Sequence, residues 1–203
     1  MSVMALGKRI FRKNRMNSDV STGVCKVGAS LQGIRIDIPM NPCPCGMAGV
    51  SDGVHKCTCT PQEIKRYTGK ISGPLLDRID IHIRVPQVEY KDLSSANRAE
   101  SSASIRQRVV AARDIQMERF KGMGIFTNSQ MSHAMMKEQC PLGNEAQSLL
   151  EMAFRKMGLS ARSYDRIIKV ARTIADLDGA KDIGAKHVGE AVQMRNDVGL
   201  EQN

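Results

Sequence analysis

The sequence predicts an α/β portion followed by an all-α helical bundle. Two stretches alternate apolar and polar residues, as half-buried strands do: Gly33–Pro39, which reads GIRIDIP, and Ile79–Val85, which reads IDIHIRV. From about Ser94 the apolar residues instead recur every three or four positions, which is typical of amphipathic helices. The chain therefore divides into three parts: a basic, poorly ordered start over 1–33, an α/β portion over 34–90 and a helical portion over 91–203.

A short helix is predicted between the two strands. Thr60 suits the N-cap position, Pro61 the first helical position, and Glu63 stands three residues after the cap, where it can bond back to the cap. Ser-Gly-Pro at residues 72–74 marks a turn before the second strand. In that strand His82 falls on the polar side, so we expect it to be solvated or hydrogen-bonded rather than catalytic.

Four amphipathic helices are predicted in the second half, within residues 101–120, 144–157, 160–177 and 184–195. Each has apolar residues on one face, which we expect to face the core. For the third helix the polar residues of the opposite face are expected in solvent. The predicted inward residues are Ile105, Val109, Ala112, Met117, Leu149, Leu150, Ala153, Met157, Ile167, Ile168, Ala171, Ile174, Ala175, Val188, Ala191 and Val192, and the predicted outward ones Arg166, Lys169, Arg172 and Asp176.

The composition favours a basic, cytoplasmic protein. The formal net charge of +9 favours anionic partners such as nucleic acid or nucleotides, whereas an aromatic content of 3% argues against a stacking platform for single strands. No apolar run approaches the length of a membrane helix, and no signal peptide is evident. We therefore expect a reducing compartment, where clustered cysteines more often bind metal than form disulfides.

Two Cys-x-Cys pairs lie close together in the sequence. Cys43 and Cys45 occur in NPCPCG, and Cys57 and Cys59 in CTCTP, so four thiolates are available for a tetrahedral zinc ion. The pairs are tighter than a usual zinc knuckle, and His55 is an alternative ligand. A free thiol cluster and buried, small apolar cysteines remain the alternatives. Cys25 and Cys140 stand apart from these pairs.

Five ordered segments between Met40 and Arg195 resemble one family. MNPCPCG, CTCTPQEIKRY, ISGPLLDRIDIHIRVP, ESSASIRQRVVAAR and GLSARSYDRIIKVARTIADL are similar to the C-terminal half of the magnesium-chelatase-like AAA+ ATPases of the YifB/ComM competence-protein type. The resemblance implies a remnant of an AAA+ α/β core followed by a helical lid. It also implies ATP and Mg²⁺ as cofactors of the complete protein and a ring, commonly a hexamer. Relatives of this type include a DNA-handling motor.

The resemblance assigns roles to three residues. Asn41 stands where a sensor residue contacts the nucleotide phosphate and the attacking water, and the alternative is that Asn41-Pro42 only makes a turn. Arg78 resembles an arginine finger, whose guanidinium offers a rigid fork of donors to a γ-phosphate across a subunit interface. Its alternative is a surface salt bridge with Asp77 or Asp80.

Arg162 resembles the second sensor arginine at the start of a lid helix, where a phosphate also meets unpaired backbone N–H groups. Its alternative is an ordinary exposed arginine in a first helical turn. Arg166 and Arg172, on the same predicted helix, are expected on a solvated face.

The phosphate-binding part of such a site is not found in the sequence. No G-x-x-x-x-G-K-[ST] motif occurs, GASLQG at residues 28–33 lacks the Lys-Ser/Thr pair, and no acidic pair closes an apolar run. We therefore expect that this chain alone does not hydrolyse ATP appreciably. The alternative functions are a non-enzymatic, basic nucleic-acid-binding module with a zinc-binding cysteine cluster, and a decayed remnant without independent function.

Overall fold

The computed structural model describes residues 26–30, 33–37, 39–49, 56–85 and 100–196. The chain groups into two compact units, and each is described separately. One contains the described residues up to Leu76 together with Val85, and the other contains Asp77–Arg84 and the helices from residue 100 onward. The segment Asp77–Arg84 therefore belongs to the helical unit. The domain boundaries at residues 33 and 90 stay predictions.

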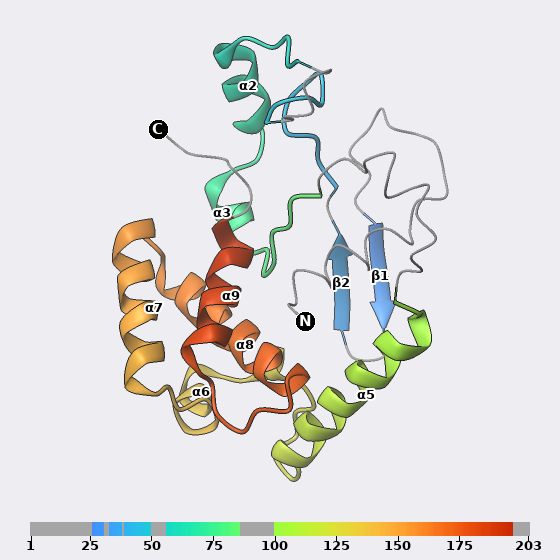
Figure 1. Ribbon diagram of the computed structural model, residues 1–203, viewed down its shortest axis with the longest axis vertical. Helices are drawn as coiled ribbons and strands as arrows, with labels where there is room; N and C mark the ends of the chain where they lie inside the picture. The colour runs from blue at the N-terminus through green and yellow to red at the C-terminus, as the bar shows by residue number, and fades with distance from the viewer. Residues whose placement is uncertain (1–25, 31–32, 38, 50–55, 86–99, 197–203) are drawn as a thin grey trace. The chain divides into compact units, whose positions relative to one another are not determined.

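The first unit contains a β-hairpin. Strand β1 (Lys26–Ser30) pairs antiparallel with β2 (Gly33–Asp37), with Lys26 opposite Asp37 and Ser30 opposite Gly33 (Figure 1). The predicted strand Gly33–Pro39 is confirmed over Gly33–Asp37. Because this hairpin is the only sheet within the described ranges, the expected α/β remnant of an AAA+ core is not shown.

Helix α2 (Pro61–Thr68) begins as its sequence predicts. The hydroxyl of Thr60 accepts the N–H of Glu63, and the Glu63 carboxylate accepts the N–H of Thr60 at 2.8 Å. This capping box satisfies backbone groups that the first helical turn leaves without partners. The four-residue helix α3 (Gly73–Leu76) follows, where the sequence indicated a turn.

The second unit is a helical bundle around α8. It comprises α5 (Ser102–Arg119), the 3₁₀ turn η1 (Asn128–Gln130), α6 (His133–Gln139), α7 (Asn144–Met157), α8 (Ala161–Leu177) and α9 (Ala185–Asn196) (Figure 1). Helix α8 packs against α5, η1, α6 and α9, and α7 packs against α9. The predicted helical half is therefore confirmed. None of the helices in the described part of the chain is long and apolar enough to cross a bilayer.

Helix α8 confirms its predicted core face and corrects its predicted polar face. Ile167, Ile168, Ala171, Ile174 and Ala175 are all buried, as expected. The expectation that the polar residues of the other face are solvated is wrong for two of them, which are fully buried and pair with each other: Arg172 and Asp176.

Helix α5 corrects a second prediction. Of the expected inward stripe only Ala112 is buried, whereas Val109 and Met117 are exposed. The buried residues of α5 are Ala112 and Gln116, which lie four residues apart and so share a face. Gln116 donates to the buried Asp176, so a polar contact rather than the apolar stripe sets the orientation of α5.

The predicted strand Ile79–Val85 is also wrong. Residues 79–85 form no strand, and the expected alternation of exposure fails at two positions: His82 is 8% exposed and Ile81 is 45% exposed. The backbone N–H of His82 donates instead to the carbonyl of Met194 at 2.7 Å, near the end of α9. A strand exists only where a neighbour pairs with it, and here a helix end takes that place.

Candidate functional sites

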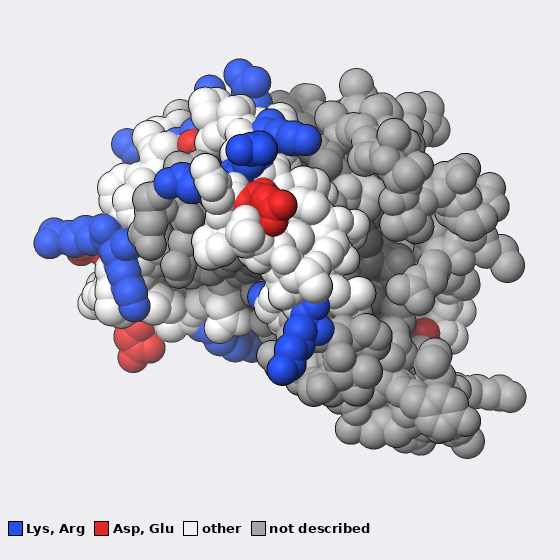
Figure 2. Space-filling view, turned by 90° about the horizontal axis from the view of Figure 1, so that it is seen from above, with Lys and Arg blue, Asp and Glu red and all other residues white. Residues whose placement is uncertain are grey.

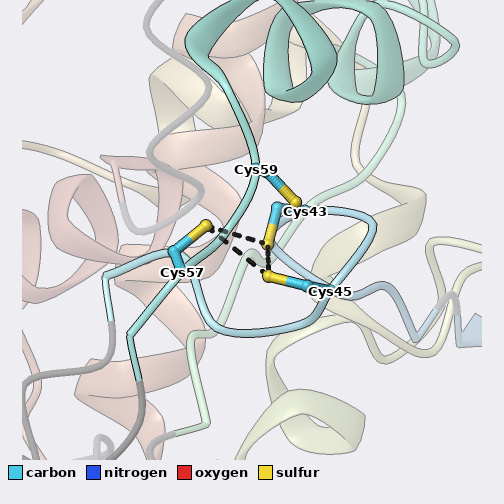
Figure 3. A group of neighbouring side chains, drawn as sticks. All are labelled: Cys43, Cys45, Cys57 and Cys59. Atoms are coloured by element: carbon cyan, nitrogen blue, oxygen red, sulfur yellow. Dashed lines mark hydrogen bonds between the residues drawn. The ribbon is translucent and has the colours of Figure 1, made fainter.

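The four cysteines of the Cys-x-Cys pairs come together in the first unit. The Cys43 sulfur lies 3.3 Å from that of Cys45 and 3.7 Å from that of Cys57, and the sulfurs of Cys45 and Cys57 are 3.6 Å apart (Figure 3). All four sulfur atoms, including that of Cys59, lie within 4.8 Å of one another. Cys43 is fully buried and the other three are partly buried.

A backbone turn brings the first two thiols together. The N–H of Gly46 donates to the carbonyl of Cys43 at 3.0 Å, which closes the Cys-Pro-Cys-Gly turn, and the N–H of Ala48 points at the Cys43 sulfur at 3.3 Å. Gly46 has a φ of +81°, a left-handed conformation that glycine adopts without strain. The turn thus directs two sulfurs and an N–H donor toward one point.

The thiols have unequal acidities. Backbone hydrogen bonds from Met47 and Thr58 lower the pKa of Cys45 to about 5. For Cys59 the backbone hydrogen bond from Cys45 lowers the pKa, but burial and the neighbouring thiols outweigh it and raise the pKa to about 12. The pKa of Cys57 is likewise raised, because burial and the neighbouring thiols outweigh the backbone hydrogen bond from Cys59. One thiolate forms readily, and further negative charge in the cluster is opposed.

The geometry fits a tetrahedral metal site better than a disulfide. A disulfide needs sulfurs about 2.05 Å apart, and these cysteines are free thiols at 3.3 Å or more. Zn–S bonds of about 2.3 Å in a tetrahedron place the sulfurs about 3.8 Å apart, near the observed separations. His55, the alternative ligand, lies outside the described residues.

Asn41 is exposed and precedes the cysteine turn by two residues. It lies four residues beyond the end of β2, and its side-chain nitrogen would be 3.9 Å from a Cβ at Gly46. Asn41 therefore adjoins the cysteine cluster within one unit. Its role as a sensor residue stays a prediction.

Arg78 is exposed, and the acids beside it have other partners. Asp77 pairs with Arg195 at 3.1 Å, and Asp80 pairs with Arg166. Among the described residues no ion pair to the guanidinium of Arg78 is found. The alternative of a salt bridge with either neighbouring acid therefore has no support, and the guanidinium faces solvent.

Arg162 is exposed in the first turn of α8. The hydroxyl of Ser160 caps this helix by accepting the N–H of Ser163 at 3.2 Å. Arg162 thus lies beside a helix N-terminus, which favours anions through its free N–H groups and dipole. Arg78 and Arg162 belong to the helical unit and Asn41 to the other.

Sequence reasoning missed the contacts around the Arg78 segment. Arg166, expected on a solvated face, donates to the backbone carbonyl of Arg78 at 2.5 Å. Asp77 accepts from Ser163 at 2.9 Å as well as from Arg195, more than a hundred residues away in the chain. The only sequence signal was the pair of acids flanking Arg78, which suggested arginine partners but not which arginines.

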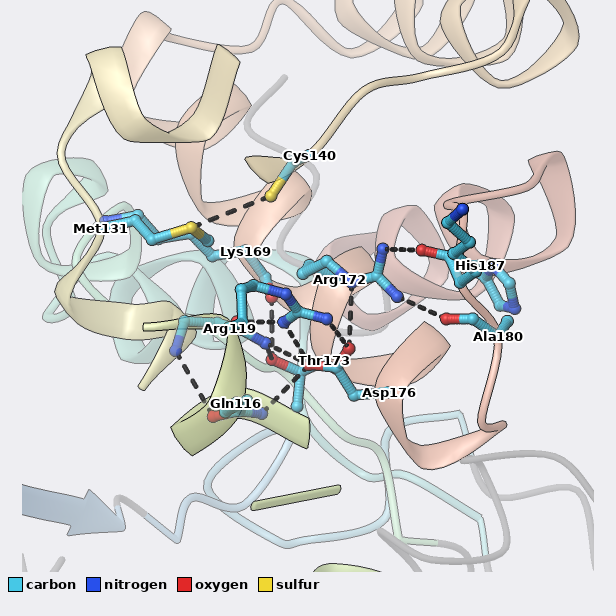
Figure 4. Close-up of polar contacts among 12 residues, drawn as sticks. Gln116, Arg119, Met131, Cys140, Lys169, Arg172, Thr173, Asp176, Ala180 and His187 are labelled. Atoms are coloured by element: carbon cyan, nitrogen blue, oxygen red, sulfur yellow. Dashed lines mark hydrogen bonds and ion pairs between the residues drawn. The ribbon is translucent and has the colours of Figure 1, made fainter. Parts of the chain in front are cut away.

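A buried ionic network centres on Asp176 (Figure 4). Arg119 donates to both carboxylate oxygens at 2.9 and 2.5 Å, and Arg172 donates at 3.1 Å. Arg172 also donates to the carbonyls of Ala180 and Lys181. Burial opposes ionisation of Asp176, but hydrogen bonds from Arg119 and from Asn128 hold its pKa below the ordinary value. These hydrogen bonds all end on residues of the bundle, so we interpret the network as structural.

Two family models match the chain. The model described as magnesium chelatase, subunit ChlI C-terminal, matches residues 99–195, and that described as magnesium chelatase, subunit ChlI, matches residues 31–93. Among curated proteins, the competence protein ComM of Haemophilus influenzae is 42% identical over 164 residues, which is 80% of this chain and 31% of that protein.

An uncharacterized YifB protein of Salmonella typhimurium is 38% identical over 157 residues, and an uncharacterized protein of Mycobacterium tuberculosis is 35% identical over 155. These matches cover 77% and 76% of this chain. The chain spans only 29–31% of the length of these relatives.

Proposed function

Because the chain belongs to the magnesium-chelatase-like family of the ComM and YifB type, we propose that it contributes an arginine finger, sensor residues and the lid to a ring-forming AAA+ ATPase. The chain matches part of the length of the members of this family. One observation carries the proposal. Arg78 is exposed, lies on a segment whose two acids pair with other arginines, and has no ion-pair partner among the described residues, so its charge is available to a phosphate of a neighbouring subunit.

Each proposed residue has a role that its surroundings support. Arg78 donates to the γ-phosphate from across a subunit interface and stabilises the charge of the transition state. Arg162, beside the N–H groups that begin α8, contacts the phosphates of a bound nucleotide. Asn41 orients the attacking water.

The residues of this chain do not fit a complete ATP·Mg²⁺ site. Its 203 residues contain no G-x-x-x-x-G-K-[ST] loop to cradle the phosphates and no acidic pair ending an apolar run to hold the metal. Without these groups, positioning and charge neutralisation are both incomplete. We therefore propose that the chain alone does not turn over ATP and that it acts together with a phosphate-loop partner.

A reconstitution experiment tests this proposal. The chain is co-expressed with the part of the Haemophilus influenzae ComM protein that its match does not cover, and ATP hydrolysis is measured for each part and for both. We expect turnover only with both parts and a loss of about 10³-fold in kcat for Arg78→Ala. The matched control is Arg106→Ala, which removes another exposed arginine, on α5. Steady turnover by the chain alone, or equal rates for Arg78→Ala and the control, would reject the proposal.

We further propose that the four-cysteine cluster binds one Zn²⁺ ion. The support is the sulfur–sulfur separations of 3.3–3.7 Å and the convergence of the two Cys-x-Cys pairs on one point. The metal would join residues 43–46 to residues 57–59, just before α2. Such a cross-link would stabilise a short loop region that has little hydrophobic core of its own.

Metal analysis of protein purified without chelators tests the zinc site. We expect about one zinc per chain, lost in Cys43→Ser and kept in Cys140→Ser, because Cys140 lies in the core of the helical unit. A zinc stoichiometry near zero in the wild-type protein, or equal zinc content in both variants, would contradict the proposed zinc site.

A nucleic-acid-binding module is the second candidate function, favoured by the net charge of +9. On the face shown in Figure 2 the lysines and arginines lie at several separate places with few acids between them. DNA binding without ATP that weakens steeply with salt, together with absent turnover in the reconstitution, would favour this module over the ATPase part. DNA as partner, a homo-oligomeric ring and a cytoplasmic location are likewise predictions.

A further inference from the structure

The carboxylate of Asp77 joins the Arg78 segment to two helices. Its Oδ1 accepts from Ser163 Oγ at 2.9 Å and from Arg195 Nη2 at 3.1 Å, and its Oδ2 accepts from Ser160 Oγ at 3.2 Å. Ser160 caps α8, and Arg195 lies in the last turn of α9. The guanidinium of Arg195 also donates to Ser163 at 3.0 Å, so the contacts form a closed ring.

The backbone that follows Asp77 is held as well. Arg166 on α8 donates to the carbonyl of Arg78 at 2.5 Å and pairs with the carboxylate of Asp80. Arg195 donates to the carbonyl of Ile79 at 2.9 Å. Charged donors thus fix two successive carbonyls, and hydrogen bonds to charged groups are the stronger kind.

The far end of the segment caps α9. The last carbonyls of a helix have no intrahelical partner. Here the N–H of His82 donates to the carbonyl of Met194 at 2.7 Å, and its Nδ1–H donates to that of Arg195 at 3.3 Å. The segment is therefore attached at its start, its middle and its end, while the side chain of Arg78 stays exposed.

We propose that Asp77, Arg166 and Arg195 are positioning residues that fix the backbone of residues 77–82 on the start of α8 and the end of α9, so that Arg78 and Arg162 move as one body. The inference rests on the proposed function for its consequence in a ring. There, a shift of α8 when Arg162 contacts a nucleotide phosphate carries Arg78 with it, and so changes the finger offered to the neighbouring subunit. The two arginines would respond to nucleotide together, through one rigid element.

A distance measurement on this chain tests the rigid attachment. Spin labels are placed on genetically encoded ketone residues at positions 78 and 162, because the chain contains six cysteines. The label at 78 keeps the backbone carbonyl that Arg166 holds. We expect one narrow distance distribution in the wild-type background and a broad one with Asp77→Ala. The control Asp165→Ala, which removes an acid that pairs with His133 on the outer side of α8, is expected to keep the narrow distribution.

Amide hydrogen exchange separates local release from unfolding. With Asp77→Ala we expect exchange about tenfold faster at the amide of His82, whose N–H donates to the carbonyl of Met194, with α7 unchanged. A broad distribution in the wild type, or a narrow one and unchanged exchange in Asp77→Ala, would overturn the proposal. If Asp77→Ala unfolds α7, the same distance and exchange measurements are made on Asp77→Asn, a milder change that keeps an oxygen acceptor for Ser163. The same two outcomes then decide for or against the proposal.

Kinetics of the reconstituted assembly test positioning as opposed to mere stability. A displaced finger weakens only the transition state, so Asp77→Ala is expected to lower kcat by up to about 10²-fold with an unchanged KM for ATP. A rise in KM with kcat unchanged would contradict the role. If Arg78→Ala leaves hydrolysis unaffected, the proposed function fails, whereas the distance measurement still decides whether the segment is rigidly attached.

Discussion

Replacing Asp176 by asparagine removes the charge at the centre of the buried network in the helical unit. Asparagine has nearly the same shape, so the change leaves no cavity. It does leave Arg172, whose side chain is 1% exposed, without its counter-charge, and it turns an amide group toward donors of Arg119. Removing one partner of a buried ion pair costs about 3–5 kcal/mol, because the other charge stays buried and uncompensated.

That cost is large relative to the stability of a domain of this size. At about 4–8 °C per kcal/mol for a bundle of roughly 100 residues, the melting temperature should fall by at least about 12 °C. Thermal and urea unfolding followed by circular dichroism measure both quantities. Asp165→Asn, an acid on the same helix that pairs with the exposed His133, should change the unfolding free energy by less than about 0.5 kcal/mol.

If Asp176→Asn lowered the unfolding free energy by no more than Asp165→Asn does, the buried charge of Asp176 would not stabilise the bundle as stated. A second experiment distinguishes the loss of the ion pair from a change in the solvation of residue 176 alone. In a double-mutant cycle with Arg119→Met, the two changes should be strongly non-additive, because both remove the same contact. Additive effects would mean that Arg119 and Asp176 do not depend on each other.

Three further outcomes are expected. Because the pKa of Asp176 is lower in the folded than in the unfolded state, its ionisation stabilises the fold fully above the unfolded-state pKa of about 3.9. This contribution is lost as pH falls through the lower folded-state pKa. The unfolding free energy of the wild type should therefore fall more steeply below about pH 4 than that of Asp176→Asn. Gly158 ends α7 at a φ of +58°, so Gly158→Ala should lower the unfolding free energy by about 1–2 kcal/mol. Gly189→Ala, inside α9 with its Cβ 3.6 Å from Leu149, should instead raise it by about 0.5–1 kcal/mol. Equal effects of the two substitutions in urea unfolding would contradict the role of the backbone angle. Chelation of zinc should accelerate amide exchange around residues 43–48 and leave the melting of the helical unit unchanged, and a lower melting temperature for that unit would show that the cluster supports more than its own unit.

The helices were predictable because their signals are local. The apolar face of α8 and the capping box of α2 depend on residues within a few positions of one another, and both were found as predicted. The family resemblance rests on the order of short motifs and is likewise readable along the chain. The sequence suggested the proximity of the four cysteines but could not fix the distances between them, because these depend on how the two Cys-x-Cys segments fold toward each other.

The contacts that decide the remaining features join distant parts of the chain. Whether Arg172 and Asp176 face solvent depends on α5, which brings Arg119 to Asp176 from 57 residues away. Whether IDIHIRV forms a strand depends on what lies beside it, and here Arg195 and the end of α9 take its hydrogen bonds instead of a neighbouring strand. Periodicity describes which residues share a face, but it carries no information on which element covers that face. Burial of charge and pairing of backbone are therefore properties of the packed molecule, since both require a partner that the local sequence does not specify.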